Sequence, residues 1–147
     1  MIVRISGPDR RSSGPVVDRR LLRSRALRML RASGSADSEL SIALIDDETI
    51  LELNADHRGI ARPTDVLSFS LLEGAFAEHR GALLGDVVIG LETAARQARD
   101  AHRSLDDEVA RLLIHGTLHL LGHDHEEPEE ERVMRAEERR LWWAMRA

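Results

Sequence analysis

Four of the chain's seven histidines fall within the eleven residues HGTLHLLGHDH, positions 115–125. In the apolar helix predicted here, His115 and His119 are four residues apart and therefore lie on one face, one turn apart. Gly122 can adopt the left-handed conformation that ends a helix, so that His125 can approach from the other side. The pattern His-x3-His-x2-Gly-x2-His supplies three imidazole donors and leaves a fourth position open, which is typical of catalytic zinc sites.

His123 leaves an alternative open, because it also follows His119 by four residues. A helix that continued through Gly122 would bring His123 to the metal-binding face instead of His125. The glycine favours a turn, so we predict His125 as the third ligand and His123 as a rim residue or substrate contact. Asp124 could orient a ligand, or it could be an exposed turn residue.

The residue after the first histidine indicates whether the metal site has the general base of a zinc protease. The same ligand spacing occurs in the metzincin proteases, whose motif is His-Glu-x2-His-x2-Gly-x2-His. Their glutamate is the general base for the attacking water, but this chain has Gly116 there. The sequence therefore predicts a metal site that lacks the usual proton acceptor of a protease. A bound metal can still activate water at neutral pH without that residue.

The bulk composition fits one soluble globular domain, which we predict to span residues 1–147. Hydrophobic residues make up 42% of the chain and charged residues 32%. We find neither an apolar run long enough to cross a bilayer nor a secretory signal, so we expect a cytoplasmic protein without a membrane partner. The chain has no cysteine, which excludes disulfides, thiolate nucleophiles and Cys-ligated zinc. Its net charge of −5 argues against broad electrostatic binding to nucleic acid.

The N-terminal third is nevertheless basic. Residues 1–35 contain nine arginines but only Asp9 and Asp18 as acids, and lysine is absent from the whole chain. The lack of lysine favours a genomic composition bias over a special role for arginine. On the helix predicted here the arginines fall largely opposite the apolar stripe. They could form an RNA-facing patch, but plain solvent exposure is the slightly favoured interpretation.

Hydrophobic patterning predicts strands interleaved with helices. Strands are expected at 1–6, 39–46, 66–69 and 83–90, and a loop at 74–82. Helices are expected from a cap at Ser13 or Gly14 to Leu30, from an Asp46 cap to a stop at Gly59, at 91–102, from a Ser104 cap to Gly122, and at 128–143. The pattern indicates an α+β (mixed α/β) fold, in which four to five helices cover a small sheet of about four strands. It does not indicate the strand order.

Three segments together resemble the YbeY family of bacterial metal-dependent endoribonucleases. HGTLHLLGHDH meets the family motif His-Gly-x-Leu-His-Leu-x-Gly-[Tyr/His]-Asp-His, glycine included. LNADHRGIARPTDVLSF at 53–69 and LLGDVVIG at 83–90 meet two further family segments in the family's order. The resemblance runs from about residue 40 to the C-terminus. The arginine-rich N-terminal third matches only in general layout.

The resemblance implies one zinc ion per chain on His115, His119 and His125, although imidazoles also suit other divalent metals. It also implies a functionally important arginine before the Pro-Thr-Asp turn, which is Arg58. An arginine beside a hydrolytic metal can hold a phosphodiester, whereas Arg58 alone would be read as a surface residue. Further cleft residues are expected at Thr64, Asp65 and Ser68, although Asp65 could equally serve as a cap or turn residue. Asp86 is expected to be structural.

The family implies a single-strand-specific endoribonuclease in ribosomal RNA processing, including 16S rRNA 3′-end maturation, and in ribosome quality control. The expected partners are ribosomal RNA, the small ribosomal subunit and ribosome-associated proteins, without DNA. Two other functions remain open from the residues. One is a ribosome-assembly or RNA-binding factor with a mainly structural metal, and the other is an atypical metallopeptidase.

Overall fold

A four-stranded mixed sheet forms the centre of the computed structural model, which describes residues 2–8, 14–59, 62–70 and 83–146. The strands are β1 (Ile2–Ser6), β2 (Glu39–Ile45), β3 (Val66–Ser70) and β4 (Leu83–Gly90), in the order β1-β2-β4-β3. β1, β2 and β4 are parallel, whereas β3 runs antiparallel to β4 at the edge. The helices are α1 (Arg19–Ala32), α2 (Asp47–Arg58), α3 (Leu91–Asp100), α4 (Leu105–Leu120) and α5 (Pro128–Arg146). The predicted α+β class is therefore confirmed.

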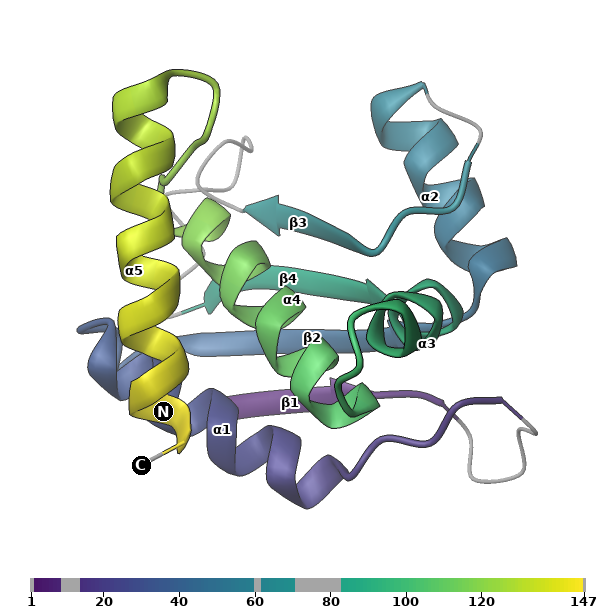
Figure 1. Ribbon diagram of the computed structural model, residues 1–147, viewed down its shortest axis with the longest axis horizontal. Helices are drawn as coiled ribbons and strands as arrows, with labels where there is room; N and C mark the ends of the chain where they lie inside the picture. Colours follow the sequence, from purple (N-terminus) through teal and green to yellow (C-terminus); the bar gives the residue numbers. More distant parts are fainter. Residues whose placement is uncertain (1, 9–13, 60–61, 71–82, 147) are drawn as a thin grey trace.

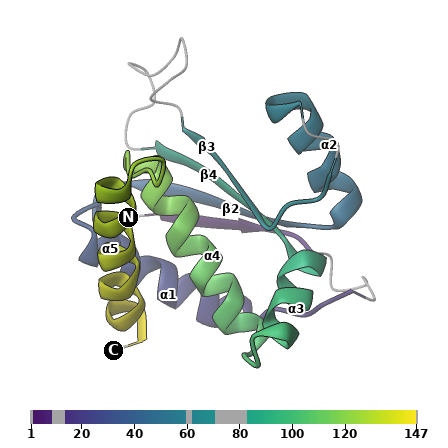
Figure 2. The ribbon, with the colours of Figure 1, turned by 45° about the horizontal axis from the view of Figure 1, so that its top comes forward.

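The helices cover the two faces of the sheet unequally. α4 crosses the sheet with α5 and α1 beside it, while α2 stands apart from these helices (Figure 1). In the turned view, α1, α3, α4 and α5 lie on one side of the sheet and α2 lies on the other (Figure 2). The larger hydrophobic core therefore lies between the sheet and the four-helix layer.

Alternation along the strands separates two cores. Ile42, Leu44, Val87 and Ile89 point into the larger core, which the apolar residues of α1, α4 and α5 complete. The intervening strand residues point to the other face, because successive side chains alternate. There Leu67 and Val88 pack with Ile50 of α2 in a smaller cluster. Both faces of β3 and β4 are thus packed, which holds the strands beside α4 firmly.

Local signals set most of the helix ends as expected. The Asp46 carboxylate accepts a hydrogen bond from the Thr49 backbone N–H at 2.8 Å, and Gly59 ends the same helix with φ 69°. Hydrogen bonding to Thr49, through its side chain and then through its backbone N–H, lowers the pKa of Asp46. The Ser104 hydroxyl accepts from the Asp107 N–H at 3.1 Å at the start of α4. These caps satisfy backbone donors that a helix leaves unpaired at its first turn.

The predicted start of the first helix was wrong. α1 begins at Arg19, and Asp18 is its N-cap, accepting from the Leu21 N–H at 3.1 Å. Gly14 and Pro15 precede the helix in irregular chain, while Ser13 lies outside the described residues. The helix starts after Asp18 rather than near Pro15, because the Asp18 carboxylate accepts a hydrogen bond from a backbone N–H of the first turn.

Several arginines of α1 make intramolecular contacts rather than only facing solvent. Arg19 donates to the Ile5 carbonyl at 2.6 Å, and Arg23 donates to the Val3 carbonyl. Two more contacts are Arg25 with Asp107 at 3.0 Å and Arg28 with the Met145 carbonyl at 3.3 Å. β1 is an edge strand, so the first two arginines cover backbone acceptors that an open edge would expose. These four side chains hold α1 to β1, α4 and α5, so solvent exposure alone does not account for them.

Within the described residues, no helix is both long and apolar enough to cross a membrane. The loop predicted at 74–82 lies outside the described residues.

We predict that Asp18→Ala lowers the free energy of unfolding by about 1 kcal/mol, because the first turn of α1 loses its cap. Asp18→Asn keeps an acceptor and should be nearly neutral. Urea denaturation monitored by circular dichroism measures both. Asp37→Ala, which removes an exposed turn carboxylate, is the control. Equal losses for the residue 18 and residue 37 alanine variants would contradict the cap.

Candidate metal centre

Three histidines converge where α4 ends. The Nε2 atoms of His115 and His119 lie 3.2 Å apart. His125 joins them, and one nitrogen from each ring forms a group whose members all lie within 4.8 Å of one another. The ring centroid of His125 lies 5.7 Å from that of His115 and 5.3 Å from that of His119. The structure thus brings together the three residues that the spacing suggested.

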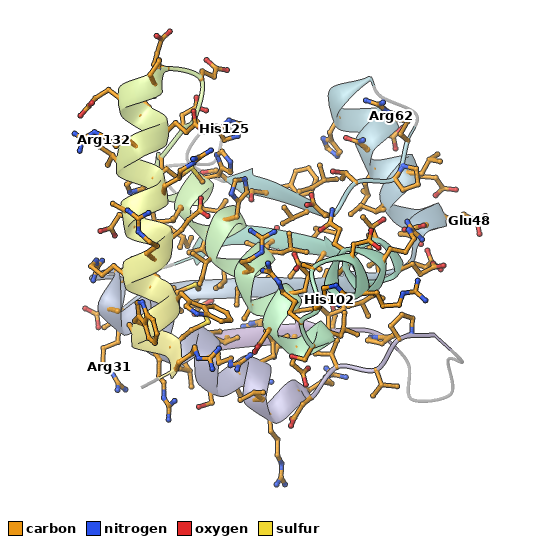
Figure 3. All side chains as sticks on the ribbon, in the orientation of Figure 1. Arg31, Glu48, Arg62, His102, His125 and Arg132 are labelled. Carbon is orange, nitrogen blue, oxygen red and sulfur yellow. The ribbon has the colours of Figure 1, made fainter. Side chains whose placement is uncertain are left out.

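A turn after α4 brings the third histidine back. Gly122 has φ 97°, a left-handed conformation that glycine adopts without penalty. The His123 N–H donates to the Leu118 carbonyl at 2.9 Å, which closes the helix end. The Asp124 carboxylate then accepts from the His125 N–H at 2.7 Å. Figure 3 shows His125 in the segment that leads into α5.

His123 lies near the centre without belonging to the nitrogen group. It lines the same cleft as the three histidines, and its backbone carbonyl lies 3.0 Å from the His119 Nδ1. A carbonyl oxygen only accepts, so the His119 Nδ1 carries the proton and its Nε2 keeps a lone pair. Burial, together with the neighbouring His115 and His125, lowers the pKa of His119. The ring is therefore neutral at neutral pH and can act as a ligand.

One partner of the histidines was not anticipated. The His115 Nδ1 lies 3.4 Å from a carboxylate oxygen of Glu138 on α5. The hydrogen bond with His115 lowers the pKa of Glu138. Glutamates are frequent throughout this helix, so the sequence held no signal that singled out this one.

The histidines face a cleft of about 570 Å³ between the end of α4 and β3. The predicted residues Thr64, Asp65, Ser68, His123 and Asp124 all line this cleft. The Asp65 carboxylate also accepts from the Gln97 amide at 3.3 Å, and its backbone carbonyl accepts from the Gly90 N–H at 2.9 Å. Asp65 therefore has a clear structural role at the entrance to β3.

Gly116 is a packing residue at the closest approach of α4 to the sheet. A Cβ at this position would lie 2.8 Å from Val87 Cγ1, 3.0 Å from Ser68 Oγ and 3.2 Å from Val66 Cγ2. Ser68 Oγ donates to the Gly116 carbonyl at 2.8 Å, which ties β3 to the helix. The position that holds a protease's glutamate thus faces the sheet here and has no room for a side chain.

Arg58 ends α2, but its side chain lies outside the described residues. Arg62 is exposed and lies beside the same end of α2 (Figure 3).

A histidine pair on a helix, a third histidine after a glycine turn and an adjoining open cleft are together the arrangement that metal-dependent hydrolases use. Residues 17–146 match the model of the family described as Endoribonuclease YbeY. The chain therefore belongs to the endoribonuclease YbeY family. Membership of this family confirms the prediction that the protein is an endoribonuclease, an enzyme that hydrolyses phosphodiester bonds of RNA.

Individual relatives agree with this assignment. A protein of Anaeromyxobacter sp. (strain Fw109-5) named endoribonuclease YbeY is 48% identical over 141 residues, which cover 96% of this chain and 70% of that protein. A protein of the same name from Symbiobacterium thermophilum is 46% identical over 121 residues, covering 80% of this chain and 78% of its own length. The solution structure of TM1509 from Thermotoga maritima matches with a TM-score of 0.66 and 26% identity, covering 98% of this chain and 89% of that one.

We predict that Gly116→Ala destabilises the fold by about 1–3 kcal/mol, because the added methyl group overpacks the contact with the sheet. The unfolding free energies of Gly116→Ala, Val87→Ala and the double variant measure this. Val87→Ala removes the nearest methyl group, so the double variant should lose less stability than the sum of the single losses. Additivity within about 0.5 kcal/mol would show that the two positions do not compete for space.

Proposed function

We propose that His115, His119 and His125 hold one zinc ion. The observation that carries this proposal is the convergence of their nitrogens at one end of the cleft. Tetrahedral zinc with bonds of 2.0–2.1 Å places two nitrogen ligands about 3.4 Å apart, and the Nε2 atoms of His115 and His119 are 3.2 Å apart. His125 is exposed, so it can adjust to complete the group. Other divalent metals that accept imidazole are compatible with these donors.

A divalent ion held by these three histidines would supply a Lewis acid for a phosphoryl oxygen and would activate water. The protein's part is to position the substrate. Arg58 is proposed to hold the phosphodiester through its guanidinium fork and to stabilise the charge that develops at phosphorus. Thr64, Asp65 and Asp124 are proposed as substrate or positioning contacts along the cleft. His123 is proposed as a further contact, and it could protonate the leaving oxygen.

The proposed substrate is single-stranded ribosomal RNA, with 16S rRNA 3′-end maturation and ribosome quality control as the processes served. A cleft of about 570 Å³ can accept a nucleotide extruded from a single strand, whereas a duplex is recognised across a broad surface. The net charge of −5 favours a few placed contacts over a wide cationic face. We propose a cytoplasmic site of action on the small ribosomal subunit, with ribosome-associated proteins as partners.

The two alternative functions receive less support. A ribosome-assembly factor with a structural metal does not require an open cleft at the ligands, and the relatives are named as endoribonucleases. A metallopeptidase requires a general base beside the metal, but Gly116 faces the sheet. Cleavage of RNA by the purified protein, set against cleavage of an unfolded protein, separates the three functions.

We predict that His115→Ala, His119→Ala and His125→Ala each reduce bound zinc far below one ion per chain, because each variant removes one of only three protein ligands. Metal analysis after dialysis measures this. His123→Ala is the matched control, since His123 contributes a backbone carbonyl that alanine retains. Loss of zinc from the residue 123 variant with full retention in the residue 125 variant would reverse the ligand assignment.

We predict that Arg58→Ala lowers the rate of single-stranded RNA cleavage about 10²–10³-fold, as expected when one donor to the developing charge is removed. Its zinc content should stay at the wild-type level. Arg58→Lys should recover only part of the rate, because lysine lacks the planar fork. Arg62→Ala, four residues along, is the control and should stay within about tenfold of wild type. Equal rates for Arg58→Ala and wild type would remove this arginine from the mechanism.

A further inference from the structure

Glu138 lies on the side of α5 that faces the metal-binding helix. α4 and α5 run side by side in both ribbon views (Figures 1 and 2). The Glu138 side chain is only 26% exposed, and its Oε1 lies 3.4 Å from the His115 Nδ1. The contact is on the opposite edge of the imidazole from Nε2, which faces His119. Among the described residues, Glu138 is not part of the group of potential ligand atoms.

Nearby arginines do not account for the position of Glu138. Arg111 and Arg135 line the same groove of about 320 Å³ between α4 and α5. Arg111 donates to Glu108 at 3.0 Å, and Arg135 pairs with Glu131. These two arginines each pair with a different carboxylate and act on Glu138 only through longer-range charge. Among the described residues, the hydrogen-bond partner of Glu138 is therefore the imidazole of His115.

This contact determines which nitrogen of His115 carries the proton. The Glu138 Oε1 lies 3.4 Å from the His115 Nδ1, and a glutamate side chain is ordinarily ionised at neutral pH, so it only accepts hydrogen bonds. The proton of a neutral His115 ring is therefore on Nδ1, and Nε2 has a lone pair. The carbonyl of His123 imposes the same tautomer on His119. Two lone pairs thus face each other across 3.2 Å, an arrangement that a cation between them stabilises.

We propose that Glu138 is a positioning residue for the metal centre, which fixes the tautomer and orientation of His115 so that Nε2 is presented to a divalent cation. The proposal rests on the zinc site put forward above. It makes the C-terminal helix part of the centre, although that helix provides no ligand. A carboxylate behind a ligating imidazole also raises the basicity of the ligand.

The test compares Glu138→Ala and Glu138→Gln with Glu137→Gln. Glu137 is the adjacent residue, and its carboxylate pairs with Arg140 at 2.8 Å, so its substitution removes the same charge without touching an imidazole contact. Zinc affinity is measured by competition with a chromophoric chelator. The His115 tautomer is read in the metal-free protein from two-bond ¹H–¹⁵N correlations, assigned with His115→Ala. Circular dichroism reports folding.

Glu138→Ala is expected to bind zinc about 10–100-fold more weakly than wild type, with His115 shifting towards the Nε2–H tautomer. Glu138→Gln, which keeps an acceptor without the charge, is expected to lose a smaller factor of at least about threefold, and Glu137→Gln to stay within about twofold. Unchanged zinc affinity or an unchanged tautomer in folded Glu138→Ala overturns the proposal.

If Glu138→Ala does not fold, the isosteric Glu138→Gln decides, and an affinity equal to that of Glu137→Gln overturns the proposal. Failure of the underlying zinc site looks different. In that case wild type itself binds no zinc, while the tautomer measurement on metal-free protein still reports whether Glu138 holds His115.

Discussion

The close approach of α4 to the sheet at Gly116 is the constraint on which the site depends. The absence of a side chain lets the helix backbone come near Val87, and Ser68 fixes the approach through its hydrogen bond to the Gly116 carbonyl. Because the helix lies this close to the sheet, the helical turn that carries His115 and His119 is adjacent to β3. The imidazoles of these histidines and the edge strand therefore line one cleft. A larger residue would push the helix outward, because packed interiors absorb little extra volume.

The same contact separates this centre from the zinc proteases whose ligand spacing it shares. In a protease the residue after the first histidine supplies the base, whereas here that position is used to pack the helix on the sheet. The chemistry would then come from the proposed metal and from groups that other elements bring to the cleft. A phosphodiester suits such a site, because its hydrolysis depends on charge stabilisation and positioning.

Several helix ends and the histidine spacing could be predicted from the sequence because they depend on local interactions. The caps at Asp46 and Ser104, the stop at Gly59 and the turn at Gly122 all act within a few residues, and so does the His115–His119 spacing. The partners of the α1 arginines and the contact of Glu138 with His115 join segments far apart in the chain, and no periodicity encodes them. The strand order depends on tertiary packing in the same way. The single-domain organisation over 1–147 and the role of Arg58 remain predictions.

The segment between α2 and β3 leads from a helix on one face of the sheet to the cleft beside α4 on the other face. α2 packs on the face opposite α4, yet Thr64 and Asp65, which follow it, line the cleft with the histidines. Within its described residues 62–65, this segment is held by several contacts. Asn54 donates to the Arg62 carbonyl at 2.9 Å, Gln97 donates to Asp65, and the Gly90 N–H donates to the Asp65 carbonyl. Among the described residues, residues 62–65 are therefore held to α2, α3 and β4, and the strand that follows them is tied to α4 through Ser68. The arginine proposed to hold phosphate at the end of α2 and the histidines of α4 come from helices that pack on opposite faces of the sheet. The proposed phosphate and metal contacts would thus be supplied by separate elements of the fold.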